Sequence, residues 1–361
     1  MSLAKWEHVN AFTEKSVEEC YVPESKSNMG FVSEHGMLID IVTRILGAVE
    51  VLENTCGDLF TEDCWLYRSL RLSRNQSRIV SAVAIDYALL RKSATLFRLH
   101  PHIEVFLKCY ECVRPENPHS VGQTGLQSCF AKLNDYVRTI RAQLHSSATK
   151  RKVAASARAV DKNFQGLVDY IDAMFECRSR LLVLRMDFSY RKNEQELKVS
   201  VFTEDDVRRV TSRIAKHRVE LLKYLKAKCP ELGMVGYAWK LEYGREKGHH
   251  YHMIFFLDGT KVREDIVIAK KIGEHWNKVI TGGAGLYFNC NRKKDSYRHC
   301  GVGMVNYYDA EKISSLKFKA AIYLTKADFY VGTAMPDNSR CFGKGNAPKV
   351  VRSGGGRPRL Y

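Results

Sequence analysis

Residues 234–257, MVGYAWKLEYGREKGHHYHMIFFL, decide the fold of the second half of the chain. Two stretches rich in apolar and aromatic residues, 234–243 and 249–257, flank the short segment GREKG at residues 244–248. Apolar stretches separated by a few residues that include glycine are typical of a β-hairpin. We therefore predict two antiparallel strands that turn near Glu246.

The elements around this hairpin predict an α+β fold. Residues 181–188 (LLVLRMDF) have the pattern of a buried strand, and residues 203–228 form a long helix that Thr203 can cap. A helix at 262–280, a strand at 302–307 and a helix at 309–329 follow the hairpin. The order β-α-β-β-α-β-α predicts a ferredoxin-like antiparallel sheet of four or five strands, with helices on one face.

The first part of the chain, residues 1–170, is predicted to be mostly helical, and its sequence does not indicate a role. Apolar residues recur at helical spacing in 37–53, 73–99, 102–113 and 126–144. Residues 146–160 (SSATKRKVAASARAV) are small, polar and basic, which indicates a linker that continues as an exposed helix. We expect a second domain over residues 178–345, and a disordered, glycine-rich basic tail over 346–361.

Composition excludes some classes of protein and favours a polyanionic partner. Of 361 residues, 57 are Lys or Arg and 40 are Asp or Glu, so the formal net charge is +17. Such an excess favours nucleic acid as a partner, although a solvated basic surface has the same composition. A hydrophobic fraction of 45% excludes wholesale disorder. The longest apolar stretch, residues 79–90, is too short for a membrane span and contains Asp86.

The hairpin carries a candidate metal site. His250 and His252 are two residues apart, so their side chains share one face of a strand. A turn near Glu246 pairs residue 242 with 250 and residue 240 with 252, which places Glu242 opposite His250 on that face. Two imidazoles and one carboxylate form a plausible three-ligand site for a divalent cation with open positions.

A second candidate motif, Tyr323-Leu324-Thr325-Lys326, lies in the last predicted helix. Residues three apart share a helix face, so Tyr323 and Lys326 can address one site. A phenol has a pKa near 10 and is a poor nucleophile at neutral pH, but a nearby ammonium favours the phenolate. A metal-polarised phosphodiester would be a suitable electrophile. Taken alone, the motif is weak and is more typical of an ordinary amphipathic helix with a surface lysine.

Together these residues resemble the HUH endonucleases, which cut single-stranded DNA. The histidine pair, Glu242 and the later tyrosine occur in the order of that superfamily. The segments 239–252, 323–326 and 340–343 (RCFG) are similar to one branch, the replication proteins of filamentous phages (inoviruses) and prophage relatives of the YagK/YfjJ type. The resemblance covers roughly residues 178–345.

The resemblance implies a nick-and-join reaction that initiates rolling-circle replication. Tyr323 would attack the scissile phosphate, leaving a 5′-phosphotyrosine and a free 3′-hydroxyl that primes synthesis. Lys326 would orient the tyrosine or the phosphate, and Tyr330 is a weaker candidate for a second nucleophile. His250, His252 and Glu242 would hold Mg²⁺ or Mn²⁺, and the types of ligand do not discriminate between these two ions.

A basic, aromatic segment at residues 289–298 (NCNRKKDSYR) is a candidate DNA-binding loop. Proteins that bind single strands combine such cations with stacking side chains, but an exposed loop without a partner has the same composition. The basic residues that we expect to contact DNA are Arg292, Lys293, Lys294 and Arg298.

The expected function is therefore nicking and rejoining of single-stranded DNA at a replication origin, with a host helicase and polymerase as further partners. A DNA-binding regulator without cutting activity is the alternative, and a metal-dependent hydrolase without a tyrosyl intermediate is less favoured. Residues 1–10 (MSLAKWEHVN) lack the apolar region of a secretory signal. The eleven cysteines are odd in number, and without such a signal they indicate reduced thiols, not a framework of disulfides. We accordingly expect a cytoplasmic protein in a bacterial host cell.

Overall fold

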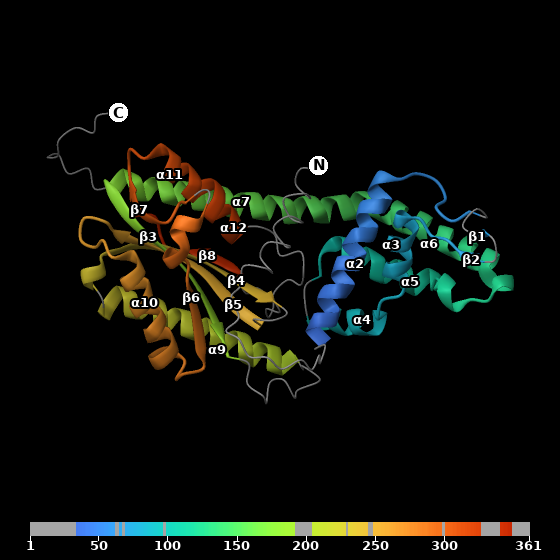
Figure 1. Cartoon of the computed structure of the whole chain (residues 1–361), viewed down its shortest axis with the longest axis horizontal. Coiled ribbons are helices and arrows are strands. Elements are labelled where there is room, and N and C mark those ends of the chain that lie inside the picture. The colour runs from blue at the N-terminus through green and yellow to red at the C-terminus, as the bar shows by residue number, and fades with distance from the viewer. Residues whose placement is uncertain are drawn as a thin grey trace. The chain divides into compact units, whose positions relative to one another are not determined.

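The computed structural model describes residues 34–61, 65–66, 69–96, 99–191, 204–228, 230–244, 248–297, 300–325 and 340–348. It confirms the α+β organisation, with a helical region followed by an antiparallel sheet (Figure 1). The helices of the first region are α2 (Glu34–Asn54), α3 (Arg74–Val83), α4 (Tyr87–Leu96), α5 (Pro101–Val113), α6 (Leu126–His145) and α7 (Ser147–Cys177). A two-stranded ribbon, β1 (Trp65–Leu66) with β2 (Ser69–Leu70), precedes α3.

The prediction of one apolar helical stretch over residues 73–99 is wrong in detail, because two helices occupy it. Ser73 caps α3 in a reciprocal arrangement with Gln76. The chain leaves the helix after Val83, and the Asp86 carboxylate then accepts a hydrogen bond from Leu89 N at 2.9 Å. Asp86 thus caps the start of α4, which is why the apolar periodicity is interrupted there.

Helix α7 is one continuous helix of 31 residues (Figure 1). Ser146 caps its start by accepting a hydrogen bond from Thr149 N, and residues 150–166 contain no fully buried side chain. The expected helix over 146–160 is therefore confirmed, and it lacks fully buried side chains from residue 150 to residue 160, although Thr149 in its first turn is buried. Its last three turns differ, because they bury Leu167, Tyr170 and Met174 against the sheet.

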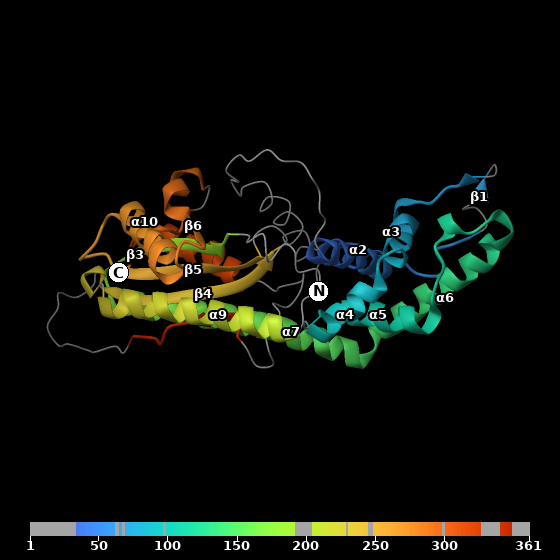
Figure 2. The same cartoon turned by 90° about the horizontal axis from the view of Figure 1, so that it is seen from below.

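The sheet has six strands in the order β6-β3-β5-β4-β8, with β7 pairing the other end of β3. All pairings are antiparallel, and the long strands β4 and β5 run side by side (Figure 2). The elements are β3 (Arg180–Tyr190), α9 (Glu204–Lys223), β4 (Met234–Gly244), β5 (Gly248–Asp258), α10 (Asp265–His275), β6 (Gly285–Asn289), β7 (Gly303–Asn306), α11 (Ala310–Ser315), α12 (Ala321–Thr325) and β8 (Phe342–Lys344).

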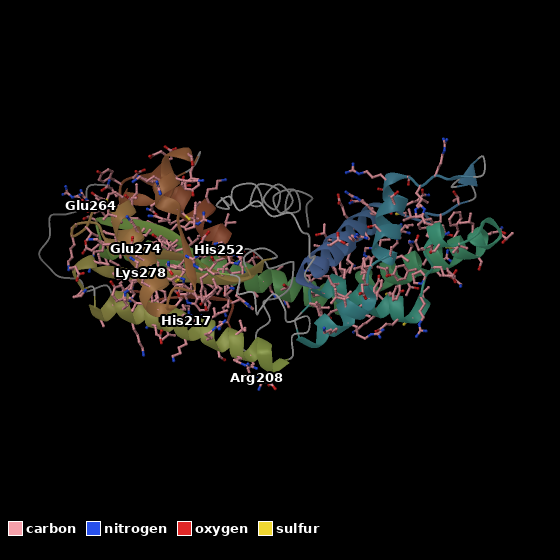
Figure 3. All side chains as sticks on the ribbon, turned by 60° about the horizontal axis from the view of Figure 1, so that its bottom comes forward. Arg208, His217, His252, Glu264, Glu274 and Lys278 are labelled. Carbon is pink, nitrogen blue, oxygen red and sulfur yellow. The ribbon has the colours of Figure 1, made fainter. Side chains whose placement is uncertain are left out.

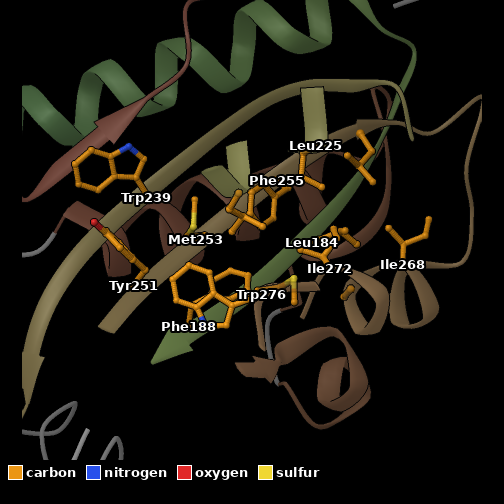
Figure 4. Packing of buried hydrophobic residues seen from close by; sticks show 14 of the residues in the cluster. Leu184, Phe188, Leu225, Trp239, Tyr251, Met253, Phe255, Ile268, Ile272 and Trp276 are labelled. Atoms are coloured by element: carbon orange, nitrogen blue, oxygen red, sulfur yellow. The ribbon is translucent and has the colours of Figure 1, made fainter. Parts of the chain in front are cut away.

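The unit β3-α9-β4-β5-α10-β6 is ferredoxin-like, and its two helices lie on one face of the sheet. The predicted order is confirmed, but the strand that completes it is β6, which was not predicted. The predicted strand at 302–307 is β7, which pairs with the other end of β3. Figure 3 labels His217 on α9 and Glu274 on α10, which mark this face. Ile214 and Leu221 of α9 and Ile272 of α10 are buried there. They pack against alternate strand residues, among them Leu184, Phe188, Met253 and Phe255, beside Trp276 (Figure 4).

Helices also cover the opposite face, which the expectation of helices on one face did not include. The end of α7 and the helix formed by α11, the π-helical turn Leu316–Ala320 and α12 pack there. Leu324 of α12 and Ile171 of α7 belong to the same buried cluster as Ala238 of β4 and Ile254 of β5. The prediction of four or five strands missed two short strands of the sheet, β6 and β8. Both faces of the sheet are thus buried over most of its length.

Candidate metal centre

The hairpin β4–β5 has the register that the sequence predicts. Glu242 pairs with His250, and Lys240 pairs with His252. Because side chains alternate along a strand, these four residues project from the same face of the sheet. This is the face that α7 and α12 cover. Ala238, two residues from Lys240, and Ile254, two residues from His252, share this face and belong to the buried cluster that contains α7 and α12.

The three predicted ligands come together. Glu242 Oε2 lies 3.4 Å from His252 Nε2 and 3.9 Å from His250 Nε2. One ligand atom from each of the three residues lies within 4.8 Å of the others. The exposed fraction is 7% for His250 and 2% for His252, so the imidazoles are shielded from solvent.

This donor set fits a divalent cation. Imidazole nitrogens and carboxylate oxygens bind such an ion at about 2.0–2.2 Å, so neighbouring ligands of one ion lie about 3 to 4 Å apart. The contacts of Glu242 with both imidazoles fall in that range. Among the described residues, Glu242, His250 and His252 form the single cluster of this kind. The group can therefore hold a metal ion, with open positions for other ligands.

Asp187 of β3 orients one ligand, and the sequence did not reveal it. Strand β3 pairs with β5 so that Asp187 lies opposite His252. Its Oδ1 lies 2.6 Å from His252 Nδ1, which directs Nε2 of the same ring towards Glu242. A carboxylate behind a ligating imidazole selects the tautomer and strengthens the ligand. Asp187 ends a recognisable strand motif, but its partner lies 65 positions away, so only the strand pairing identifies its role.

Carboxylates dominate the electrostatics of this centre. Burial alone would lower the pKa of His252, but the adjacent Asp187 and Glu242 carboxylates outweigh it and raise the pKa above 6.5. The raised pKa shows that the environment favours a positive charge at this imidazole. The same negative environment favours a divalent cation.

Substitution of Asp187 by Asn is expected to weaken metal binding without removing a ligand. An amide keeps the size of the side chain but loses the charge that orients and polarises His252, so the affinity for Mn²⁺ should fall about 10- to 100-fold. Titration of the purified protein with Mn²⁺, with free ion followed by electron paramagnetic resonance, measures the change. An unchanged affinity would show that Asp187 does not support this ligand.

The helix that carries Tyr323 lies on the face of the metal group. The backbone of Tyr323 belongs to α12, whose neighbours Ala321 and Leu324 are buried against the sheet. Lys317, in the preceding π-helical turn, forms an ion pair with Asp172 of α7, and a Cβ atom at Gly301 would collide with the backbone of Leu316. These contacts hold the helix against the sheet. The side chain of Tyr323, and all of Lys326 and Tyr330, lie outside the described residues.

The candidate DNA-binding residues differ in whether their charges are exposed or paired within the fold. Residues Cys290–Ser296 form a 3₁₀ segment, in which Arg292 and Lys293 are exposed. Lys294 instead donates to both carboxylate oxygens of Asp265, at 3.0 and 2.8 Å. Its charge is paired within the fold, so Lys294 is a poorer candidate for a phosphate contact than its two neighbours. Arg298 lies outside the described residues.

Asn291 attaches this segment to the sheet. Its side chain is fully buried, accepts a hydrogen bond from Arg185 N and donates to Val183 O and to Asp265 Oδ2. Burial alone would raise the pKa of Asp265, but its bonds with Asn291 and Lys294 outweigh burial and hold the pKa below the ordinary value. The basic segment is therefore fixed where β6 ends beside β3.

Comparison with known protein families adds a decisive observation. The sequence model of the YagK/YfjJ C-terminal domain matches residues 142–345, which is more than half of the chain. The chain belongs to the YagK/YfjJ C-terminal domain family. No curated protein and no solved structure matches it.

The YagK/YfjJ C-terminal domain in this chain includes more than the ferredoxin-like unit. The matched segment begins in the last turn of α6, contains all of α7 and every strand of the six-stranded sheet, and ends just after β8. It starts before residue 178, where we expected the second domain to begin, and α7 contributes to the core of the sheet. No helix in the described part of the chain has the length and apolar character needed to cross a bilayer.

Proposed function

We propose that this chain is a metal-dependent enzyme that nicks and rejoins single-stranded DNA, and so initiates rolling-circle replication of a phage or another mobile element. The observation that carries the proposal is the buried group of Glu242, His250 and His252 on the sheet face that the helix of Tyr323 also covers. The resemblance to the inovirus replication proteins and the net charge of +17 support single-stranded DNA as the substrate.

The reaction conserves the energy of the bond that it breaks. The Tyr323 oxygen, after losing its proton, forms a bond to the scissile phosphorus, and the bond from phosphorus to the 3′-oxygen breaks. The 3′-oxygen takes up a proton and leaves as a hydroxyl, while the 5′ end stays on the protein as a phosphotyrosine. The reverse attack by a 3′-hydroxyl rejoins the strand, which is why a covalent intermediate suits the task.

Each residue has a defined part in this proposal. Glu242, His250 and His252 would hold Mg²⁺ or Mn²⁺, which supplies Lewis-acid polarisation of the phosphate when bound. Lys326 would orient the tyrosine or the phosphate, and Tyr330 would serve as a second nucleophile in strand transfer. The exposed Arg292 and Lys293 would contact the DNA backbone. The free 3′-hydroxyl would prime a host polymerase, with a host helicase opening the duplex in the cytoplasm.

The test is formation of a covalent complex. Overlapping single-stranded oligonucleotides that span the DNA around the gene are incubated with the protein and Mn²⁺, and products are separated on a denaturing gel. We expect one oligonucleotide to give a protein–DNA adduct, and we expect EDTA to prevent it. Binding without any adduct would favour the regulator, and multiple turnover without an adduct would favour a hydrolase.

A further inference from the structure

Lys240 is a charged residue in the metal centre that the proposed function leaves without a role. It pairs with His252 across β4 and β5, and on its other side with Phe342 of β8. Glu242 lies two residues further along the same strand, on the same face. Directly paired residues have Cβ atoms about 5 Å apart, so the Lys240 side chain begins next to a metal ligand.

The burial of Lys240 is unusual for a lysine. Only 5% of its surface is exposed, whereas lysine is almost never fully buried unless it is paired. Removing an ammonium from water is costly, so a buried position needs compensating negative charge. Glu242 on the same strand and Asp187, opposite His252 on β3, are carboxylates that the strand register places on the same face as Lys240.

Metal binding changes this balance. One divalent cation would balance the charges of these two carboxylates, so the metal-loaded face would carry the charge of Lys240 beside that of the ion. Arg185, half buried two residues before Asp187 on the same face of β3, adds a further positive charge there. An anion that lies against the metal and the lysine together would be attracted by both.

We propose that Lys240 and the metal centre form one anion subsite, in which the lysine ammonium binds a non-bridging oxygen of a DNA phosphodiester. The choice of DNA phosphate as the anion rests on the proposed function. The subsite itself rests on the position and burial of Lys240. A charge-assisted hydrogen bond from an ammonium to a phosphate oxygen is among the stronger kinds of polar contact. In this subsite Lys240 would hold the phosphate against the ion and stabilise the extra negative charge that develops during attack.

A purely structural role for Lys240 makes a different prediction. If the lysine only neutralises Glu242, its removal leaves a more negative centre that binds Mn²⁺ more tightly and has no effect on phosphate. If the lysine binds phosphate, its removal lowers the affinity for the anion and does not lower the affinity for Mn²⁺. Separate measurements of the two ligands therefore distinguish the two roles.

The experiment uses the full chain loaded with Mn²⁺ and a thymidine dinucleotide, a phosphodiester with no origin sequence. Paramagnetic broadening of the ³¹P signal by bound Mn²⁺ reports the affinity of the diester, and electron paramagnetic resonance reports the affinity of Mn²⁺. We expect Lys240→Met to lower the affinity for the diester about 10- to 100-fold, as for loss of a hydrogen bond to a charged group. Lys240→Arg should stay within about threefold of the wild type, because it keeps the charge.

Lys344 provides the matched control. It lies on the neighbouring strand β8, where it pairs with Ala238, and its ammonium lies over the ring of Tyr170, 4.8 Å from the centroid. Lys344→Met removes the same charge from the same face and should leave both affinities unchanged. A diester affinity that is unchanged in Lys240→Met, or lowered equally in Lys344→Met, would overturn the subsite. So would a loss in Lys240→Arg as large as in Lys240→Met.

These outcomes are independent of cutting. A wild-type protein that binds the diester through Lys240 but forms no adduct would refute the nicking reaction and leave the subsite standing. An adduct that forms at the wild-type rate in Lys240→Met, with unchanged diester affinity, would refute the subsite and leave the nicking reaction standing.

Discussion

Replacement of Tyr323 by Phe is expected to abolish the covalent adduct between this protein and single-stranded DNA. The substitution removes the one oxygen that forms the bond to phosphorus, so the yield of adduct should fall on the order of 10³-fold or more. The ring is kept, so binding of the same oligonucleotide, measured by fluorescence anisotropy, should change less than about threefold. The comparison separates loss of chemistry from loss of affinity.

Tyr308→Phe is the control for this substitution. Tyr308 follows β7 and is 70% exposed, so removal of its hydroxyl should affect neither the adduct nor the fold. Adduct formation that persists in Tyr323→Phe and disappears in Tyr330→Phe would assign the nucleophile to Tyr330 instead. Loss of the adduct in Tyr308→Phe would show that a tyrosine outside α12 is required.

Substitution of His252 by Ala should remove metal binding and, with it, adduct formation. His252 is central to the group because one nitrogen faces Glu242 and the other contacts Asp187. Its loss removes a direct ligand and leaves two carboxylates without the imidazole between them, so the affinity for Mn²⁺ should fall about 100-fold or more. This exceeds the effect expected for Asp187, which acts through the ligand.

His249→Ala is the matched control. His249 pairs with Tyr243 on the same two strands, but its position in the alternation directs it to the opposite face from His250. The His249→Ala variant should therefore bind Mn²⁺ with the affinity of the wild type. Tryptophan fluorescence of Trp239 on β4 and of Trp276, which follows α10, checks that each variant is folded, because both side chains are buried in the core on one face of the sheet. Equal losses in the two histidine variants would contradict the assignment of ligands.

The candidate metal ligands were predictable because they are local in sequence. Only a few residues separate β4 from β5, and a loop of that length leaves little freedom in the register of a hairpin. Once the register is known, alternation places Glu242, His250 and His252 on one face. Most of the ferredoxin-like order was predictable because each long element shows its own periodicity. The short strand β6 was not predicted, because it lies in a stretch rich in glycine and asparagine.

The sequence alone therefore determined the hairpin, the placement of the three candidate ligands on one face and most of the order of the elements, since each depends on periodicity or on a short connection. Only the tertiary structure decided which distant segments meet them. It placed Asp187 behind His252 across the pairing of β3 with β5, and it placed α7 and α12 on the face of the metal group. It also buried Lys240 beside that group, whereas a lysine in the sequence of an isolated hairpin predicts an exposed cation. The reason is physical: strand pairing and helix packing between remote segments depend on surface complementarity across the whole core, which no short stretch of sequence records.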